Sequence, residues 1–256
     1  MTTEESATAR LRALQSRAPD APHDLNIRHG VAWAACDDGI AAMPEVAESL
    51  CDLVDLRPGW KVLDIGNGTC SRAAARRGCE VTSQPHAEAL PFAAGAFDVV
   101  LSMFGVMFAV NQVLAASEML RVCRHDGRIG LANWTPRGFM GRLFTLVDGC
   151  SAPPAGLVGA TLWGLDDHLE RLFGASAWDL QTNYRDVVFR YGSAEVFVNA
   201  LRTCDGPVRE AFAGLSAPAQ RQLEQDLLYL IADFNISSNS TVVLPSEYVE
   251  VVVLKK

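Results

Sequence analysis

The chain has 256 residues, with 22 Lys and Arg against 30 Asp and Glu, which gives a net charge of −8. This acidic balance argues against nucleic acid as the main partner, because the phosphate backbone would be repelled. The length suits one α/β domain with additions, and a hydrophobic content of 49% is enough for a sizeable core. The seven cysteines form no C-x-x-C pair, which predicts a reducing compartment without disulfides or a zinc site.

The chain divides into a leader and one larger domain. Residues 1–30 mix acidic and basic side chains without an apolar signal segment, so we expect a helical leader and no signal peptide. The longest apolar run, Val99–Val110, is too short to span a bilayer. We therefore predict a cytoplasmic protein with no membrane partner. Residues 31–256 are predicted to be a single domain, with a core at 57–136 and a cap with closing strands at 137–256.

Apolar spacing predicts the secondary structure. In chain order the expected elements are a helix in 31–56 divided at Pro44, strand 61–65, helix 70–77 closed by Gly78, strands 79–83 and 97–103, helix 111–124, strand 127–134, helices 138–148 and 166–174, strand 178–191, helices 193–204 and 218–235, and strand 248–256. Strands that alternate with helices indicate an α/β fold with a doubly wound, mostly parallel sheet. The apolar side of the helix over 111–124 is predicted to hold Val113, Leu114, Met119, Leu120 and Val122.

Four segments occur in the order found in one known family. They are "VLDIGNGT", "AEALPFAAGAFDVVLSMFGVMFA", "LRVCRHDGRIGLANWTPRGF" and "LWG". Together they resemble the class I S-adenosyl-L-methionine (SAM)-dependent methyltransferases of type 11, akin to the ubiquinone/menaquinone C-methyltransferases. The resemblance extends from about Trp33 to the final strand, and it implies a Rossmann-like fold with a C-terminal helical cap and a closing antiparallel strand.

The resemblance implies roles for the turn after the first strand. Asp64 begins the acid-x-Gly-x-Gly motif, which in the family holds the amino-acid end of SAM, and Asn67 lies between Gly66 and Gly68. Glycine tolerates a positive φ and has no Cβ to obstruct a ligand, so the physical chemistry agrees. An ordinary strand-to-helix turn is the alternative. The strand before the turn and the helix after it favour a cofactor turn.

Two further segments are implied to meet the cofactor. In the family a carboxylate and the next residue's backbone contact adenine, and His86 and Ala87 occupy those positions here. His86 is either a general base or a loop histidine in a vacated position. Ser102 and Phe104 are expected near the methyl-donor end. Core packing is as good an account of the apolar residues there: Met103, Phe104, Met107 and Phe108.

The carboxylate that holds the ribose in the family has no counterpart. The second strand ends in Ser83, Gln84 and Pro85, all neutral. Two charge-assisted hydrogen bonds, each worth ~1.5–3 kcal/mol, would be lost, which weakens SAM binding by roughly 10²–10⁴-fold. Gln84 and His86 are expected to recover part of this loss as neutral partners. The sequence thus predicts SAM as the cofactor, bound in a degenerate pocket.

The connection that follows is also short. Thirteen residues separate Ser83 from Phe97, whereas one crossover between parallel strands needs ~10–12 residues. The chain is therefore predicted to cross directly, so that the sheet lacks one edge strand and helix of the family. The edge left exposed is a candidate surface for homo- or hetero-oligomers.

Three functions remain open at this point. The first is SAM-dependent methylation of a small molecule, with no catalytic residue assigned. The second is a catalytically inactive methyltransferase-fold protein that binds another ligand or serves as partner subunit of an active relative. The third is a SAM-independent cyclisation or isomerisation. None of the five histidines forms an H-x-x-x-H pair, so no metal site is predicted.

Overall fold

The computed structural model describes residues 43–66, 68–150, 159–204 and 206–256, so the expected leader at 1–30 and Asn67 lie outside the described residues. The strands are β1 (Lys61–Ile65), β2 (Glu80–Gln84), β3 (Phe97–Met103), β4 (Cys123–Trp134), β5 (Ala177–Tyr191) and β6 (Val242–Lys255). The helices are α3 (Pro44–Leu53), α4 (Thr69–Arg76), α5 (Gln112–Val122), α6 (Phe139–Cys150), α7 (Asp166–Phe173), α8 (Ala194–Cys204), α9 (Gly206–Gly214) and α10 (Ala217–Phe234). Short 3-10 turns are η1 (Val106–Phe108), η2 (Ala160–Gly164) and η3 (Gly174–Ser176).

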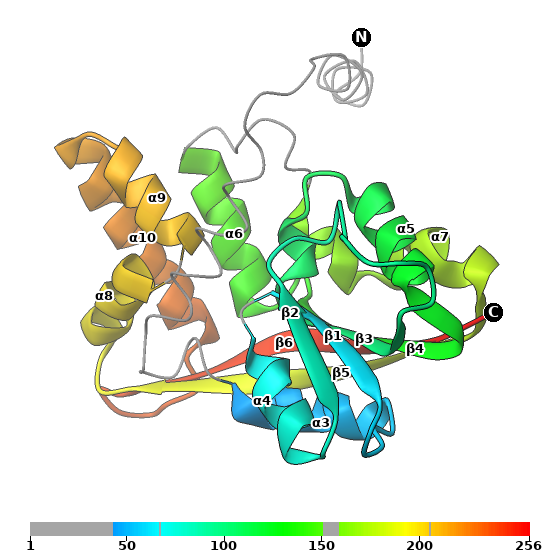
Figure 1. Cartoon of the computed structure of the whole chain (residues 1–256). Coiled ribbons are helices and arrows are strands. Elements are labelled where there is room, and N and C mark those ends of the chain that lie inside the picture. The colour runs from blue at the N-terminus through cyan, green and yellow to red at the C-terminus, as the bar shows by residue number, and fades with distance from the viewer. Residues whose placement is uncertain (1–42, 67, 151–158, 205) are drawn as a thin grey trace, which may run out of the picture.

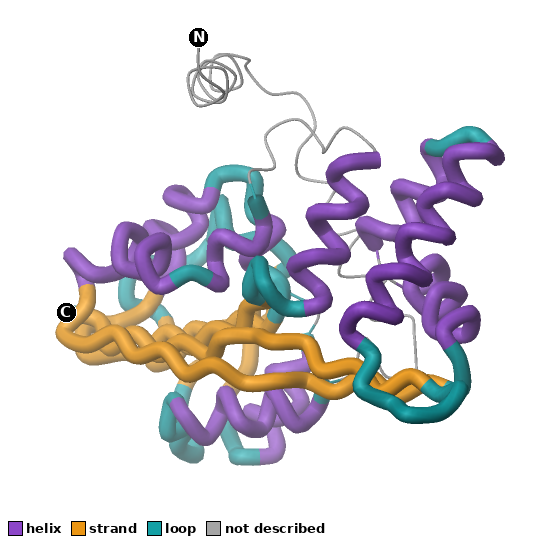
Figure 2. The backbone as a smooth tube through the Cα atoms, turned by 180° about the vertical axis from the view of Figure 1, so that it is seen from behind, coloured by secondary structure: helices purple, strands orange, loops and turns teal. Residues whose placement is uncertain are grey.

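The described strands form one sheet in the order β2-β1-β3-β4-β6-β5. The first four are parallel, and β6 and β5 are antiparallel additions. Helices α3 and α4 cover one face, while α5 and α7 cover the other (Figure 1, Figure 2). Helices α8 to α10 connect β5 to β6 and gather with α6 at one end of the sheet (Figure 1). The predicted α/β fold, with its helical cap and closing strands, is confirmed.

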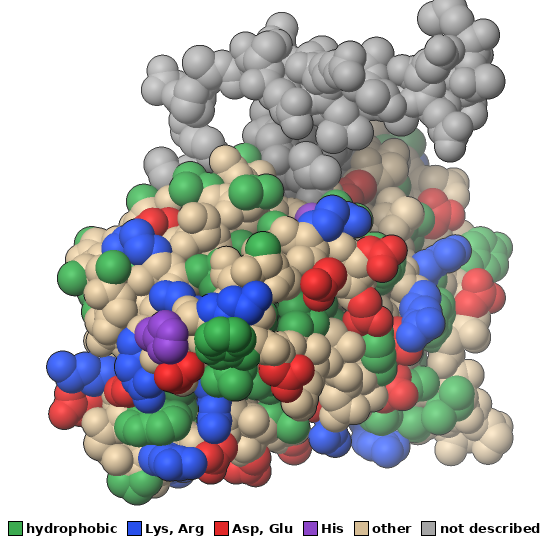
Figure 3. Space-filling model, turned by 90° about the vertical axis from the view of Figure 1, so that its right-hand side faces the viewer, with side chains coloured by type: hydrophobic (Ala, Val, Ile, Leu, Met, Phe, Trp, Pro, Cys, Tyr) green, Lys and Arg blue, Asp and Glu red, His purple; other side chains and the backbone are tan. Residues whose placement is uncertain are grey.

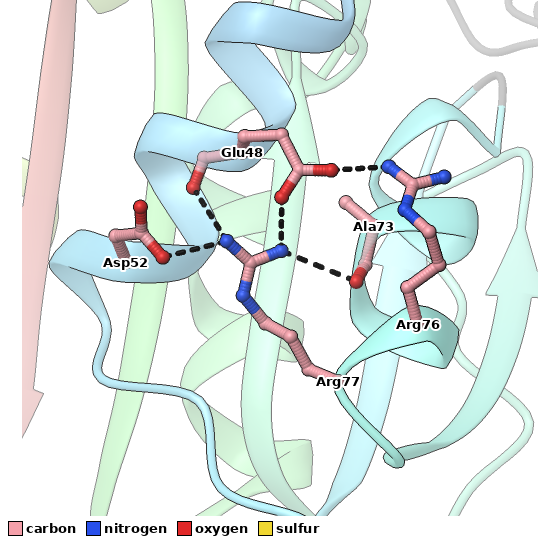
Figure 4. Close-up of polar contacts among 5 residues, drawn as sticks. All are labelled: Glu48, Asp52, Ala73, Arg76 and Arg77. Atoms are coloured by element: carbon pink, nitrogen blue, oxygen red, sulfur yellow. Dashed lines mark hydrogen bonds and ion pairs between the residues drawn. The ribbon is translucent and has the colours of Figure 1, made fainter.

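An ion-pair network fastens α3 to α4 (Figure 4). Arg77 Nη2 lies 2.6 Å from Asp52 Oδ1, and Arg77 Nη1 binds the Glu48 carboxylate. Arg77 also donates to the carbonyl oxygens of Ala73 and Glu48, each at 3.3 Å. Arg76 binds the other Glu48 oxygen, but its side chain is 60% exposed, whereas that of Arg77 is 23% exposed. Arg77, the residue that follows α4, is therefore the better buried of the two arginines that link the helices.

We expect Arg77→Gln to lower the free energy of unfolding by about 1–2 kcal/mol, because it leaves two carboxylates and two carbonyls without their shared donor. For a chain of this size the melting temperature should fall by roughly 3–6 °C in a thermal scan. Arg76→Gln is the matched control and should change the melting temperature much less, since exposed ion pairs contribute little. Equal effects of the two variants would contradict this assignment.

The chain crosses directly from β2 to β3, as predicted. Residues 85–96, all of them described, contain no helix or strand. The connection is tied to α5 instead: Glu118 accepts from the Leu90 amide at 2.9 Å, and Arg121 donates to the carbonyl oxygens of Leu90 and Phe92 at 2.9 and 2.6 Å. These side chains satisfy backbone groups that a crossover helix would satisfy internally. Strand β2 consequently lies at the edge of the sheet.

The buried side of α5 differs from the prediction. Val113 and Leu114 are 70% and 43% exposed, so their assignment to the apolar side is wrong. The buried stripe has two alanines at its centre and consists of Gln112, Ala115, Ala116, Met119 and Val122. Residues three and four apart share a helix face, and the two largest apolar residues at the start of α5 fall outside that stripe. The two buried alanines, Ala115 and Ala116, allow α5 to pack closely, which larger side chains at these positions would prevent.

Two strands begin at least four residues before their predicted start, and one described helix is additional. Strand β4 begins at Cys123 and contains an irregularity opposite Phe97–Val99, where Asp126 has φ 55°. Strand β6 begins at Val242 and contains Pro245. At Pro245 the strand pairs with β5 only, because its pairing with β4 begins at Tyr248, so a residue without an N–H group is tolerated there. Helix α9 was not predicted, since its glycine ends read as loop signals.

One side of the molecule carries interspersed acidic and basic side chains (Figure 3). Three guanidinium groups surround the Trp60 ring at 5.4–5.9 Å, those of Arg57, Arg124 and Arg128. Each of them also pairs with an aspartate. Arg57 and Arg128 share Asp55, and Arg124 pairs with Asp98, so two carboxylates offset most of the positive charge around Trp60. None of the described helices is long and apolar enough to cross a bilayer.

Candidate functional site

The carboxyl ends of the parallel strands meet at the glycine turn. The Gly66 amide donates to the Gln84 carbonyl at 2.9 Å, which joins the ends of β1 and β2. Ser102 Oγ donates to the Ile65 carbonyl at 2.8 Å and accepts from the Val106 amide at 2.9 Å, which joins the ends of β1 and β3. In open parallel sheets ligands bind at this edge. The structure thus brings together Gly66, Gln84 and Ser102, three of the predicted cofactor residues.

Asp64 is almost fully buried, at 1% exposed, at the end of β1. Its Oδ2 accepts from the amide and the hydroxyl of Ser71 at 2.7 and 2.8 Å, in the first turn of α4. The Ser71 hydroxyl in turn lies 2.6 Å from that of Ser83 on β2. A carboxylate is stabilised at a helix N-terminus, so Asp64 orients α4 beneath the turn. Ser71 was not identified from the sequence. A hydroxyl residue in the first turn of the helix that begins at Thr69 is a signal that could have indicated this hydrogen bond.

Burial raises the pKa of Asp64 from 3.8 to about 6, although the two Ser71 hydrogen bonds lower it. Between these two pH values the folded protein holds a proton that the unfolded chain has released. The stability contribution of Asp64 is therefore present below about pH 4 and is lost as the pH rises through about 6. A shift of about two units corresponds to roughly 3 kcal/mol at most.

We expect Asp64→Asn to be more stable than the native chain at pH 7.5 by about 1–3 kcal/mol, with the difference shrinking toward pH 4, because an amide does not ionise. Urea unfolding at several pH values measures this. Asp98→Asn is the opposite control: burial raises the pKa of Asp98, but the bonds from the Lys61 amide and Arg124 outweigh this and lower it. That variant should lose stability at pH 7.5. An unchanged pH slope in Asp64→Asn would refute the assignment.

Three glycines shape the site. Gly66 and Gly68 have φ of 134° and 78°, which other residues rarely adopt. Among the described residues, a Cβ on Gly68 would meet no atom within 4 Å. Gly105, by contrast, lies close to the backbone of the glycine turn. A Cβ added to Gly105 would lie 2.8 Å from the Ile65 carbonyl oxygen and 3.0 Å from Gly66 Cα. The loops after β1 and β3 therefore touch through their backbones, and Gly105 was not identified from the sequence.

The remaining predicted adenine contacts lie on the connection after β2. Ala87 is buried, at 1% exposed, and His86 is half-buried. Glu88 Oε1 accepts from the Asn111 amide at 2.7 Å and so holds this segment against the start of α5. His86 and Ala87 therefore directly follow the end of β2, beside Gln84.

Aromatic rings form a wall beside the turn. Phe104 has φ 54°, a strained value for a large side chain, and its ring stacks on Trp134 with centroids 4.0 Å apart and planes at 8°. Tyr248 meets Phe104 edge-on at 5.8 Å. Met103, Phe104, Met107 and Phe108 are all buried. Packing on Trp134 holds Phe104 in its strained conformation at the end of β3.

A buried carboxylate supports this wall from β6. Glu250 accepts from Arg185 Nε at 2.6 Å and from the Tyr248 hydroxyl at 3.1 Å, with its side chain fully buried. Burial, followed by the charge of Glu250, raises the pKa of Tyr248, so that it stays neutral and a donor at pH 7. Among the described residues there is no group of three side chains able to hold a metal ion.

Comparison with known proteins finds relatives of the segment that contains this site. The model of a methyltransferase domain matches residues 61–131, which span the glycine turn, the direct connection, and most of β4. The uncharacterized protein Rv1405c of Mycobacterium tuberculosis is 31% identical over 244 residues, covering 82% of this chain and 89% of that protein. The demethylmenaquinone methyltransferase of Beutenbergia cavernae is 36% identical over 107 residues, covering 33% and 45% of the two chains.

A solved structure shares the fold at low identity. Phosphoethanolamine N-methyltransferase 2 of Haemonchus contortus, in complex with S-adenosylhomocysteine, superposes with a TM-score of 0.51 at 14% identity, over 90% of this chain and 57% of that one. The family resemblance expected from "VLDIGNGT" and the segments after it is thereby confirmed. The chain belongs to the family of Rv1405c, and its residues 61–131 form a methyltransferase domain of type 11.

Proposed function

We propose that the protein transfers a methyl group from SAM to a small molecule, and that it holds SAM mainly by its methionine end. The observation that carries the proposal is the glycine turn: Gly66 and Gly68 have positive φ at the carboxyl edge, and a Cβ on Gly68 would meet no atom of the described residues within 4 Å. This turn leads into the N-terminus of α4, whose amides and dipole suit the carboxylate of a methionine moiety. These residues therefore fit that end of the cofactor.

The residues at the end of β2 fit the sugar less well. Ser83 and Gln84 offer the ribose a hydroxyl and an amide. A carboxylate at this position would accept two stronger, charge-assisted hydrogen bonds from the ribose hydroxyls. Bound SAM would supply a methyl group on a positively charged sulfur. The chain's own part is to orient and to exclude water: Ser102 fixes the loop after β3, and Phe104 with Trp134 forms an apolar wall. Positioning of this kind supplies most of the rate gain in a methyl transfer.

Calorimetric titration with SAM and with S-adenosylhomocysteine tests the proposal. We expect saturable binding, roughly 10²–10⁴-fold weaker than in a pocket with a ribose carboxylate, and a rise in melting temperature at saturating ligand. Asp64→Asn should weaken this binding while remaining folded, because its charge and its hold on Ser71 are altered. If millimolar SAM produces no binding heat and no change in melting temperature, the proposal is wrong.

A second role, as a non-catalytic partner subunit in the cytoplasm, rests on the open edge of β2. The side chains of that strand include Glu80, Thr82 and Ser83, all exposed. Polar and charged residues on an edge strand usually prevent pairing with another chain. We therefore favour methylation of a small molecule over a role as partner subunit. A monomer by light scattering that also turns over SAM would exclude the second role.

A further inference from the structure

Three side chains form a line of hydrogen bonds from the interior to the surface beside the glycine turn. The Asp64 carboxylate is buried near the end of β1, and its Oδ2 accepts from the Ser71 hydroxyl at 2.8 Å. The Ser71 hydroxyl lies 2.6 Å from that of Ser83, which is exposed on β2. Both distances are typical of good hydrogen bonds between oxygen atoms. Asp64, Ser71 and Ser83 thus form a hydroxyl relay.

An ionised Asp64 fixes the direction of each bond in the relay. A carboxylate can only accept hydrogen bonds, so the single proton of the Ser71 hydroxyl must point to Asp64. Ser71 then offers only lone pairs to Ser83, so Ser83 must donate its own proton to Ser71. The Ser83 oxygen therefore presents only lone pairs to the surface, and it acts there as a hydrogen-bond acceptor.

The relay ends at the carboxyl edge of the sheet. Ser83 pairs with Asp64 across the sheet and directly precedes Gln84, whose carbonyl oxygen accepts from the Gly66 amide at 2.9 Å. Its hydroxyl contacts a side chain in the first turn of α4, the helix that follows the glycine turn. A ligand with one end at the N-terminus of α4 can therefore place a neighbouring hydroxyl group beside Ser83.

We propose that the hydroxyl relay binds a ribose hydroxyl of SAM, with Ser83 as the acceptor and with Ser71 and Asp64 as positioning residues. This inference rests on the proposed function. A ribose hydroxyl can donate, and an acceptor whose own proton is already used matches it. The charge of Asp64 strengthens that acceptor, because linked hydrogen bonds polarise one another. A buried carboxylate on β1 thereby replaces, through two hydroxyls, part of what a carboxylate on β2 would supply.

The relay makes this binding depend on pH. Burial raises the pKa of Asp64 to about 6, against the hydrogen bonds from Ser71 and the charge of Arg72. Burial also raises the pKa of the two thiols near Asp64, those of Cys70 and Cys51, so both stay neutral between about pH 5 and 7.5. The positions opposite Asp64 on β2 and β3 carry no charge. Among these groups Asp64 alone titrates in that range, and below about pH 6 it gains a proton and no longer fixes the direction of the relay.

Calorimetry with S-adenosylhomocysteine at pH 7.5 and pH 5 tests the relay. We expect Ser83→Ala to raise the dissociation constant about five- to tenfold at pH 7.5, the loss of about one hydrogen bond, and by less than about twofold at pH 5. Ser71→Ala should raise it by a similar factor at pH 7.5. Adding Ser83→Ala to that variant should change little more, because the two hydroxyls act as one unit.

Two further variants serve as controls for the calorimetry. Ser83→Thr keeps the hydroxyl and should bind S-adenosylhomocysteine as the native chain does. Thr82→Val removes the hydroxyl of the exposed neighbouring residue, whose side chain points to the other face of β2. It should also keep the native dissociation constant at both pH values.

A second measurement needs no ligand. The ¹³C signal of the Asp64 carboxyl group, followed by NMR against pH, reports the pKa of Asp64. Ser71→Ala should raise this pKa, because it removes a hydrogen bond to the ionised form. Ser83→Ala should raise it by less, because Ser83 only strengthens that bond. An unmoved pKa in Ser83→Ala would show that the hydroxyls are not coupled to Asp64, and would overturn the inference.

The outcomes separate this inference from the proposed function. If S-adenosylhomocysteine does not bind the native chain, both are wrong. If it binds and Ser83→Ala has the native affinity at pH 7.5, only this inference is wrong. An equal loss of affinity in Ser83→Ala at both pH values would mean that Ser83 merely ties β2 to α4, and this result would also contradict the relay.

Discussion

Gly105→Ala is expected to abolish measurable SAM binding and to destabilise the fold. The added Cβ would lie 2.8 Å from the Ile65 carbonyl oxygen and 3.0 Å from Gly66 Cα, both backbone atoms that cannot rotate away. The loop after β3 must therefore move off the glycine turn, which also strains the Ser102 bond to Ile65. Forced overpacking of this kind costs about 1–3 kcal/mol. Calorimetry with SAM and urea unfolding measure the two effects.

Gly149→Ala is the control, since it makes the same substitution in open surroundings. A Cβ on Gly149 would meet no atom of the described part of the chain within 4 Å, and the residue lies in α6. In a helix, alanine is favoured over glycine by about 0.5–1 kcal/mol. Gly149→Ala should therefore be slightly more stable and bind SAM as the native chain does. If Gly105→Ala behaved like Gly149→Ala, close backbone contact between the two loops would not be needed for the site.

Gln84→Glu is expected to tighten SAM binding by about 10–100-fold, because a carboxylate at the end of β2 can accept charge-assisted hydrogen bonds from the ribose hydroxyls. The substitution keeps the shape of the side chain, and the Gln84 backbone already holds the Gly66 amide. Register places Gln84 opposite Ile65, next to the turn. The gain would appear in calorimetry as a lower dissociation constant for both SAM and S-adenosylhomocysteine.

Thr82→Glu controls for added negative charge. Thr82 is exposed on the same strand and pairs with Leu63, two positions farther from the turn. Its substitution by glutamate should leave the affinity for SAM nearly unchanged, because the ribose is out of reach and exposed charge is screened. Equal affinities of native protein and Gln84→Glu would show that the nucleoside lies elsewhere.

The sheet was predictable because each of its strands has a local signature. "KVLDI" and "FDVVLSM" are short apolar runs bounded by turn residues, and they became β1 and β3 with the expected bounds. The direct connection followed from chain length alone, since thirteen residues cannot contain two crossovers and a strand. Both inferences depend only on neighbouring residues along the chain.

Much of the site depended on contacts between distant residues. Ser71 binds Asp64, and Gly105 touches Gly66, yet no periodic pattern marks either contact. The buried stripe of α5 uses small residues such as Ala115, so reasoning from the size of the apolar side chains chose the wrong face.

The direct connection also affects the order in which the chain can assemble. Val62 pairs with Val99 across the shortened loop, whereas Arg128 must find Leu254 near the other end of the chain. Pairing of nearby segments is fast, and contacts between remote ones slow folding. We therefore expect the four parallel strands to form an early nucleus. The hairpin of β5 and β6, with the helices it encloses, would dock last and complete the aromatic wall.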